Sequence, residues 1–354
     1  MLKTLGAHLG EYKRPSILTP LFMLLEVLME TIIPLLMASI VDNGIEAGNI
    51  THVYQMGGWM IVCALVGLFA GMAGARNGAL ASAGLARNLR EAMFTNIQRF
   101  SFANIDKYST AGLVTRLTTD VTNVQNSYQM ILRMCTRAPA SLICAMAMAF
   151  FINARLASIY LVAVIVLGAL LILISSRAMK YFSEVFKKYD DLNASVQENV
   201  SAIRVVKAYV REDYETSKFT KASQNLYRMF VKAEGIVAWN SPLMMATVYT
   251  CILLLSWIGA RMIVVGSLTT GELMSLLTYC MNILMSLMML SMIFVMVTMS
   301  MAAAKRICEV LEEEPTLTNP ENPVMTVPDG SIDFDHVDFA YKEDGNLVLT
   351  DIDL

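Results

Sequence analysis

Two carboxylates stand inside an apolar run near the N-terminus, where a charge is costly. Glu26 and Glu30 are four residues apart within Ile17–Val41, so on a helix they share one face. Ionisable groups inside a membrane span are expensive, and they face the bundle interior or water. We weigh a cavity wall that receives a cationic substrate, a gating ion pair, and a structural brace between helices. Three arginines in the next two apolar runs are available as partners: Arg76, Arg133 and Arg137.

A second candidate surface is a stripe of methionines in the last apolar run. Its members lie three or four residues apart and so share one helix face: Met281, Met285, Met288, Met292, Met296 and Met299. Methionine is flexible and polarizable, and it is overused at surfaces that bind many partners. The stripe predicts an apolar substrate cavity with Met285, Met292 and Met296 as candidate contacts. Ordinary helix packing or lipid contact is the alternative.

Cysteines and histidines do not predict a metal site. The three histidines are scattered, and the six cysteines lie mostly in apolar runs without a CxxC pair. A free cysteine behaves as a small hydrophobic residue, so we interpret these as packing residues.

Six apolar runs are long enough to cross a bilayer and would position these side chains. The 354-residue chain is 56% hydrophobic and 16% charged, whereas soluble domains are about 25% charged. A spanning helix needs about 20 mostly apolar residues. The runs of that length are Ile17–Val41, Met56–Leu80, Ile131–Ile152, Leu156–Ser175, Pro242–Val265 and Leu273–Ala304. The pattern predicts an all-α polytopic membrane protein.

Basic residues are concentrated in alternate connections between these runs. Arg87–Gln129 holds five Lys or Arg and Arg177–Lys232 holds eleven, whereas Asp42–Gln55 and Gly266–Glu272 hold none. The positive-inside rule then places both long connections and both termini in the cytoplasm of a multi-pass cell-membrane protein, which we take to be bacterial and of the plasma membrane. Helical apolar spacing in the long connections predicts that the helices continue beyond the lipid.

The last part of the chain changes character. Four glutamates between 309 and 314 and four prolines between 315 and 328 predict a linker over 309–330. After it, apolar and polar residues alternate on both sides of the turn residues Asp344-Gly345, which predicts a β-hairpin that opens a soluble domain. We therefore divide the chain into an amphipathic N-terminal segment (1–14), a six-helix domain (15–308) with cytoplasmic extensions (81–130 and 176–241), the linker (309–330) and the start of a second domain (331–354).

Three strings in the expected order resemble the ABC exporter family. Phe102–Val121 resembles its first intracellular loop, in which a short coupling helix precedes a Gly, an Arg and an Asp that fall here on Gly112, Arg116 and Asp120. Gln197–Glu215 resembles its second intracellular loop. VDFAYKEDGNLVLTDIDL resembles the first strands of its α/β nucleotide-binding domain, with Tyr341 at the position that stacks on adenine.

The resemblance implies a mechanism and assigns residues to it. Two such halves, identical or different, would form a dimer in the lipid bilayer, and ATP with Mg²⁺ would drive alternating access through the coupling helices. The residues implied for coupling lie in the two intracellular loops: Phe102, Asn104, Ile105, Asp106, Val206, Tyr209, Arg211 and Glu212. Tyr209 is the best single candidate for a socket residue, with packing inside the helical bundle as its alternative.

The family's phosphate loop, GxxxxGK[ST], does not occur in these 354 residues. A phosphate cradle needs that glycine-rich backbone and its lysine. We therefore expect no catalytic residue and no ATP hydrolysis within this segment, and an ATP-hydrolysing translocase only in an intact transporter.

The resemblance favours export of hydrophobic or amphipathic small molecules, lipids or peptides, as in multidrug exporters, and no nucleic-acid partner. A nucleotide-gated channel, a regulatory scaffold and an importer on the same fold are alternatives, because a fold does not fix a function. A carrier driven by a proton or sodium gradient is a further alternative, which predicts transport without ATP.

Overall fold

The computed structural model describes residues 1–354 except 318–321, 324, 327–328 and 341–346, and except the side chains of 2, 106, 291, 294, 295, 298 and 299. Short helices α1 (Leu2–Ala7) and η1 (Gly10–Tyr12) open the chain. The long helices are α2 (Lys13–Ser39), α3 (Ile50–Ile97), α6 (Val121–Ile152), α7 (Ala154–Ser201), α9 (Glu212–Val237), α10 (Asn240–Val264) and α11 (Thr270–Glu312). Shorter pieces connect them: η2 (Ile40–Glu46), α4 (Phe102–Lys107), α5 (Thr110–Thr115), η3 (Arg116–Asp120) and α8 (Ile203–Ala208).

The six predicted spans are confirmed as helices. Five of the apolar runs fall within α2 with η2, α3, α6, α7 or α11, and Pro242–Val265 ends one residue after α10. Six helices of the described chain are long and apolar enough to cross a membrane. Helices α3 and α7 have 48 residues each. A helix of that length measures about 72 Å, more than twice the hydrocarbon thickness of about 30 Å. Both helices therefore continue well beyond the lipid.

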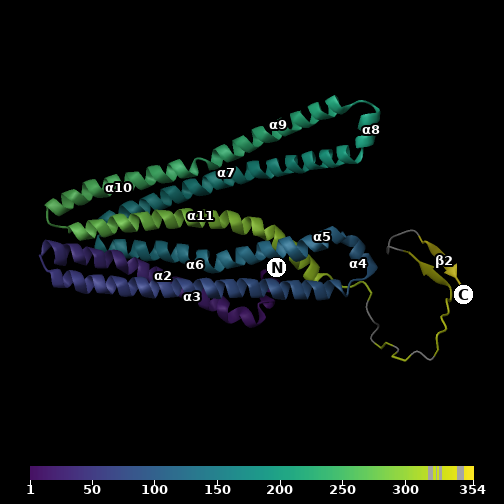
Figure 1. Ribbon diagram of the computed structural model, residues 1–354, viewed down its shortest axis with the longest axis horizontal. Coiled ribbons are helices and arrows are strands. Elements are labelled where there is room, and N and C mark those ends of the chain that lie inside the picture. The colour runs from purple at the N-terminus through teal and green to yellow at the C-terminus, as the bar shows by residue number, and fades with distance from the viewer. Residues whose placement is uncertain (318–321, 324, 327–328, 341–346) are drawn as a thin grey trace. The chain divides into compact units, whose positions relative to one another are not determined.

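The chain forms two compact units. The larger unit comprises residues 22–72 and 134–293. Within it α7 packs along α9 and α10, as Figure 1 shows. Its main core joins α6, α7, α10 and α11, and Tyr160, Leu255, Leu276 and Ile283 are fully buried there.

Proline determines where α9 ends and α10 begins. Pro242 lies in the first turn of α10, and its ring nitrogen has no hydrogen to donate to the carbonyl of Ala238. The chain makes a turn at Ala238 and Trp239, and the Ala238 and Trp239 amides bond back to Glu234 and Ile236. The helix is thus interrupted directly before the predicted fifth span.

The smaller unit comprises residues 1–21, 73–133 and 294–354. Its core is built from α3, the first intracellular loop and the end of α11, with Leu89, Met93, Val121 and Ile307 at its centre. The N-terminal segment packs on this core through Leu5 and Leu9. Gly84 permits the approach, since a Cβ there would overlap the ring of Tyr12.

The boundary of the predicted linker differs from the structure. The prediction began the linker at Glu309, whereas α11 continues to Glu312. The reason is packing, because Val310 is fully buried and Leu311 contacts the core of the smaller unit.

After the linker, β1 (Val337–Phe339) pairs antiparallel with β2 (Leu349–Ile352). The register sets Val337 opposite Ile352 and Phe339 opposite Leu349. This is the predicted hairpin, and the turn expected at Asp344-Gly345 lies outside the described residues.

Candidate functional site

The first predicted coupling element is a capped helix with an exposed apolar start. In α4 the Ser101 hydroxyl accepts from the Asn104 amide, and the Asn104 side chain accepts from the Ser101 amide, so both ends of a capping box are present. Phe102 is 86% exposed and Ile105 is 39% exposed. Asp106 also lies in α4. An exposed aromatic on a rigid capped helix is suited to seating in another domain.

Asn104 has a different environment from its neighbours, because it is buried and faces the chain after α11. Its Nδ2 donates to Glu313 Oε1 and to the Glu314 carbonyl, both at 3.0 Å. Its Oδ1 accepts from the Thr316 amide at 3.1 Å, and the Ser101 and Thr316 hydroxyls are also bonded. One side chain thus fixes three positions of the linker, Glu313, Glu314 and Thr316, to α4.

Glu313 receives three side-chain donors from the first intracellular loop. Lys107 Nζ lies 2.7 Å from its Oε2, the Tyr108 hydroxyl donates to the same oxygen at 2.9 Å, and Asn104 donates to Oε1. The Lys107 ammonium is the main cause that lowers the pKa of Glu313, with Asn104 and Tyr108 acting in the same direction. Partial burial and this carboxylate together raise the pKa of Tyr108.

Two further ion pairs continue this contact along the end of α11. The buried Asp120 carboxylate accepts from Arg306 Nε at 2.7 Å and from Nη2 at 2.5 Å, a two-point pair that raises the pKa of Arg306. Arg116 pairs with Glu309 at 3.1 Å and donates to the Arg306 carbonyl at 2.9 Å. We call the set the linker clamp: Asn104, Lys107, Tyr108, Arg116, Asp120, Arg306, Glu309 and Glu313.

Sequence reasoning identified the loop side of the linker clamp and missed the other side. Arg116 and Asp120 were singled out only as matches to a family pattern. Their partners Arg306 and Glu309, followed by Glu313, recur every three or four residues and so share one helix face. In the loop, the basic Arg116 and the acidic Asp120 are also four residues apart. Charged residues at matching spacing in the two segments were the sequence signal that could have predicted this contact.

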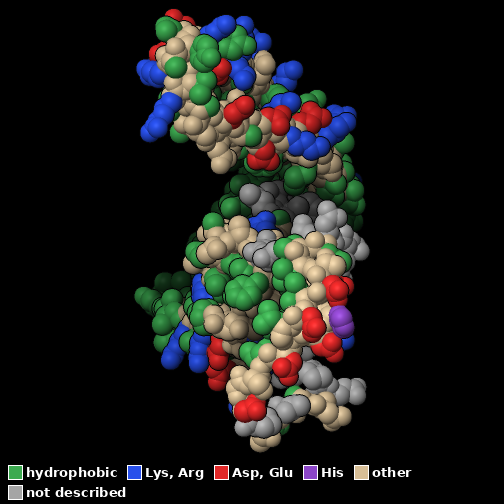
Figure 2. Space-filling model, turned by 90° about the vertical axis from the view of Figure 1, so that its right-hand side faces the viewer, with side chains coloured by type: hydrophobic (Ala, Val, Ile, Leu, Met, Phe, Trp, Pro, Cys, Tyr) green, Lys and Arg blue, Asp and Glu red, His purple; other side chains and the backbone are tan. Residues whose placement is uncertain are grey.

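The second predicted coupling element lies at the turn between α7 and α9. Helix α8 is followed by Tyr209, which is 76% exposed, and by Val210, whose φ of 52° reverses the chain. Glu212 pairs with Lys207 at 3.3 Å across this turn. Val206 is half-buried, and Arg211 is exposed directly before α9. Figure 2 shows basic side chains gathered around this end of the molecule, at the top of the view.

The intramembrane glutamates form a three-membered ion cluster. Arg137, one of the three arginines considered, donates from Nη1 to Glu26 Oε1 at 2.8 Å and from Nη2 to Glu30 Oε1 at 2.7 Å. Two carboxylates share one guanidinium, so the cluster carries an excess negative charge when both are ionised. Glu26 Oε2 is buried and has no hydrogen-bond partner among the described atoms. Arg76 is exposed on α3.

Glycine makes room for this cluster. A Cβ at Gly71 of α3 would lie 3.2–3.3 Å from the carboxyl atoms of Glu26, tighter than ordinary van der Waals contact. A larger residue would therefore push the carboxylate away from Arg137. The small residue lets α3 approach a charged group on α2.

The methionine stripe runs along α11 beside the first span. The Tyr279 hydroxyl donates to the Thr31 carbonyl and the Ser275 hydroxyl to the Pro34 carbonyl, both at 2.6 Å, which sets α11 antiparallel to α2. Met285 is 56% exposed and Met292 is 66% exposed, and Met296 is half-buried. The side chain of Met299 lies outside the described set.

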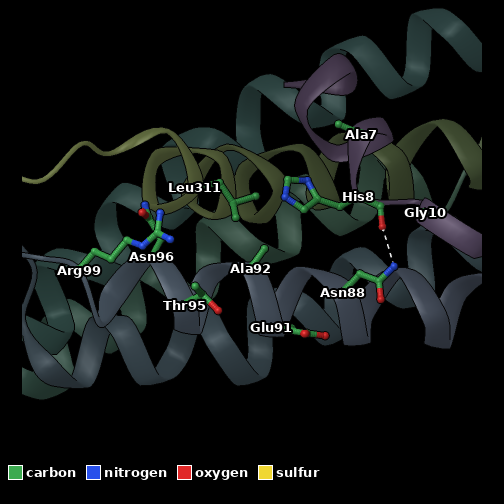
Figure 3. Close-up of a pocket in the computed structure, with 10 residues that line it drawn as sticks. All are labelled: Ala7, His8, Gly10, Asn88, Glu91, Ala92, Thr95, Asn96, Arg99 and Leu311. Atoms are coloured by element: carbon green, nitrogen blue, oxygen red, sulfur yellow. Dashed lines mark hydrogen bonds between the residues drawn. The ribbon is translucent and has the colours of Figure 1, made fainter.

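A polar cavity of about 540 Å³ lies between the N-terminal segment, α3 and the end of α11 (Figure 3). Polar side chains that line it include Asn88 and Asn96 from α3 and Arg99 from the turn after α3. Asn88 Nδ2 donates to the His8 carbonyl at 2.9 Å, and Asn96 Nδ2 donates to the Val310 carbonyl at 2.8 Å. These side chains fasten both chain segments to α3, so we assign the lining a structural role.

Tyr341, the predicted adenine-stacking residue, lies outside the described residues. Within the part of the chain that is described, no group of three or more His, Cys, Asp or Glu side chains is arranged to hold a metal ion.

Comparison with known proteins gives one family and several relatives. The family described as ABC transporter transmembrane region matches residues 16–288. An uncharacterized ABC transporter ATP-binding protein, YfiB of Bacillus subtilis, is 33% identical over 91% of this chain and 56% of its own length. An ATP-dependent lipid A-core flippase of Desulfotalea psychrophila is 24% identical over 72% of this chain and 45% of its own. A probable multidrug resistance ABC transporter ATP-binding/permease protein, YheI of B. subtilis, is 27% identical over 58% and 35%.

Proposed function

The chain belongs to the ABC transporter transmembrane region family, and from that membership we propose that it is the membrane domain of an ATP-driven exporter. The chain spans about half the length of the curated relatives named above, so the activity belongs to a longer protein. Its substrates would be hydrophobic or amphipathic small molecules, lipids or peptides, moved by alternating access.

The observation that carries this proposal is the linker clamp. Arg306, Glu309 and Glu313 join the end of the last span to the first intracellular loop. A nucleotide-driven movement of the domain that follows the linker would therefore displace α11 and α4 together. The N···O distances of these three ion pairs are 2.5–3.1 Å, so a displacement of one partner would move the other by nearly the same amount.

The second loop supplies the other contact that coupling requires. We assign the exposed Tyr209 to a socket in a nucleotide-binding domain, with Val206, Arg211 and Glu212 at its edge. An exposed aromatic with a polar rim is typical of a docking anchor. Phe102 and Ile105 would make the equivalent contact from α4, with Asp106 on the same short helix.

We propose a dimer of two such halves in the bacterial plasma membrane, with both termini and both long loops in the cytoplasm. The distribution of Lys and Arg supports this orientation. The wide exposure of apolar side chains along α2, α3 and α7 is consistent with surfaces that meet lipid or a second half. The partner may be identical or different in sequence without altering these contacts.

The substrate class rests on two features of the spans. The exposed methionines Met285 and Met292 offer an adaptable apolar surface. Glu30 is half-exposed on the antiparallel helix α2, and Glu26 and Arg76 complete the set of polar cavity candidates. Two relatives are named for lipid A-core flipping and multidrug resistance, which agrees with amphipathic cargo.

ATP and Mg²⁺ would be bound by the intact transporter. The phosphate loop does not occur in these 354 residues, so the groups that hold the phosphates and the metal would come from the remainder of the protein. Tyr341 would contribute adenine stacking from this chain, since an aromatic face suits a purine.

Reconstitution of the full-length protein in liposomes tests this proposal against its alternatives. Export predicts substrate movement in a fixed ratio to ATP hydrolysed, with no sustained ionic current. A nucleotide-gated channel predicts a current that far exceeds ATP turnover, and a scaffold predicts neither. An importer predicts that deletion of the gene abolishes uptake of a nutrient by whole cells.

A further inference from the structure

A groove of about 420 Å³ runs between α7 and the junction of α9 with α10. It lies entirely within the larger unit. Its walls are apolar and include Leu173 and Ile174 from α7 and Ile236 and Leu243 from the other side. The groove is present because Pro242 interrupts the helix there, so that α9 and α10 do not follow α7 as one straight rod.

Three residues of the lining have a different chemistry from these walls. They are Arg177, Tyr181 and Trp239, and Arg177 is the only charged side chain in the lining. Trp239 is 62% exposed and Tyr181 is 41% exposed. Arg177 makes no ion pair or side-chain hydrogen bond with any residue that the structure describes. The exposed Arg177 guanidinium thus shares the lining of an apolar groove with two aromatic residues.

The position of these residues along their helices identifies the surroundings. Arg177 is the second residue after the fourth predicted span, and Trp239 precedes the fifth by three residues. Both therefore lie at the level where the hydrocarbon ends. Trp and Tyr concentrate at that level, because their rings are apolar and their N–H or O–H groups need water or headgroups.

We propose that this groove binds an anionic phospholipid of the leaflet that faces the cytoplasm. The Arg177 guanidinium would pair with the lipid phosphate, a geometry that guanidinium supports with two donors. One acyl chain would lie along Leu173, Ile174 and Leu243. The proposal goes beyond the transport function, and from that function it takes only the membrane orientation.

Charge complementarity selects this occupant over an apolar one. A neutral hydrophobic molecule or the apolar face of a second half would cover Arg177 without pairing it, and an unpaired buried charge is costly. An anionic headgroup removes that cost while its chain fills the apolar walls. Because such a lipid contacts both sides of the break at Trp239, it would stabilise the angle between α7 and α10.

Trp239 is a built-in reporter for the test. The full-length transporter is prepared with Trp239 as its only tryptophan and reconstituted with phosphatidylglycerol or phosphatidylcholine carrying brominated chains, which quench tryptophan on contact. We expect half-maximal quenching at a mole fraction of phosphatidylglycerol about fivefold lower than that of phosphatidylcholine. One basic side chain near the membrane supplies a preference of this size for an anionic lipid. Arg177→Gln should abolish this preference and leave quenching by both lipids at the weaker level.

A matched control separates the groove from general surface attraction. Lys13→Gln removes one positive charge at the start of α2, outside the groove, and should retain the fivefold preference. Equal quenching by both lipids in the unmodified protein would overturn the proposal. An equal loss of preference in Arg177→Gln and Lys13→Gln would also overturn it, because that result indicates attraction by surface charge alone. The absence of quenching would overturn it as well, because that result indicates that a second half covers Trp239.

Discussion

Replacing Arg137 by Met tests the ion cluster in the spans. Met resembles Arg in length and keeps apolar packing, but it leaves Glu26 and Glu30 without their shared cation. The two carboxylates lie one helical turn apart, and Glu26 is 14% exposed. The variant therefore combines a desolvated charge with repulsion between like charges.

The expected cost follows from the contacts that are lost. Removing one partner from a buried pair typically costs about 3–5 kcal/mol, because a charge remains without compensation. Here two contacts of 2.8 and 2.7 Å disappear, and the 46% exposure of Glu30 reduces the loss on that side. We expect Arg137→Met to destabilise the protein by about 2–4 kcal/mol.

Single and combined variants separate charge from packing. Glu30→Gln leaves the Glu26–Arg137 pair intact and should cost less than about 1 kcal/mol. The triple variant Glu26→Gln, Glu30→Gln, Arg137→Met contains no charge and should recover most of the stability lost in Arg137→Met. Glu234→Gln, at an exposed position of α9, is the control for a glutamate replacement.

Thermal unfolding of the purified full-length protein in one detergent measures all four variants. The reasoning predicts the order wild type and Glu234→Gln first, then Glu30→Gln, then the triple variant, with Arg137→Met lowest. If Arg137→Met unfolds with the wild type, or if the triple variant is less stable than Arg137→Met, the cluster is not a charge-balanced brace.

Three further predictions use other parts of the molecule. Tyr209→Ala should lower substrate transport per ATP at least tenfold, equal to a docking loss of about 1.4 kcal/mol, without changing the unfolding temperature. Tyr227→Ala, at another exposed tyrosine, should change neither transport nor unfolding temperature. Glu313→Gln should destabilise the linker clamp by about 1 kcal/mol at neutral pH. Because the pKa of Glu313 is lowered in the folded protein, its stabilising contribution is complete above about pH 4.5 and is lost as the pH falls through the folded pKa. Unfolding curves of the wild type and the variant should therefore converge in acid. Gly271→Ala should lower the unfolding temperature, since its Cβ would overlap the Ala38 carbonyl, and Gly235→Ala, with open space around it, should not.

The spans were predictable because lipid imposes a simple rule on sequence. Every backbone group must be bonded within the segment, so a long apolar run without charges has few alternatives to a helix. The run Leu156–Ser175 illustrates this, since it lies wholly within α7. The short helix α4 was also predictable, because Ser101 directly before the helix and Asn104 within its first turn stand at capping-box spacing.

Tertiary partners were much less predictable than elements. Glu26 and Glu30 had three arginines within reach along the chain, and only the packing of α6 against α2 brings Arg137 to both. The linker clamp joins residues about 190–210 positions apart, and at that separation the sequence shows matching charge spacing but does not specify which residues pair. The acidic residues from Glu309 onward predicted the start of the linker, whereas α11 continues to Glu312 because Val310 is buried.

ATP-dependent accumulation of a hydrophobic dye in inside-out membrane vesicles tests the central claim most directly. The full-length protein is expressed, the proton and sodium gradients are collapsed with ionophores, and dye uptake is followed with and without ATP and Mg²⁺. The account predicts uptake that requires ATP and continues after the gradients are collapsed. Uptake that stops with the gradients and does not respond to ATP would contradict it.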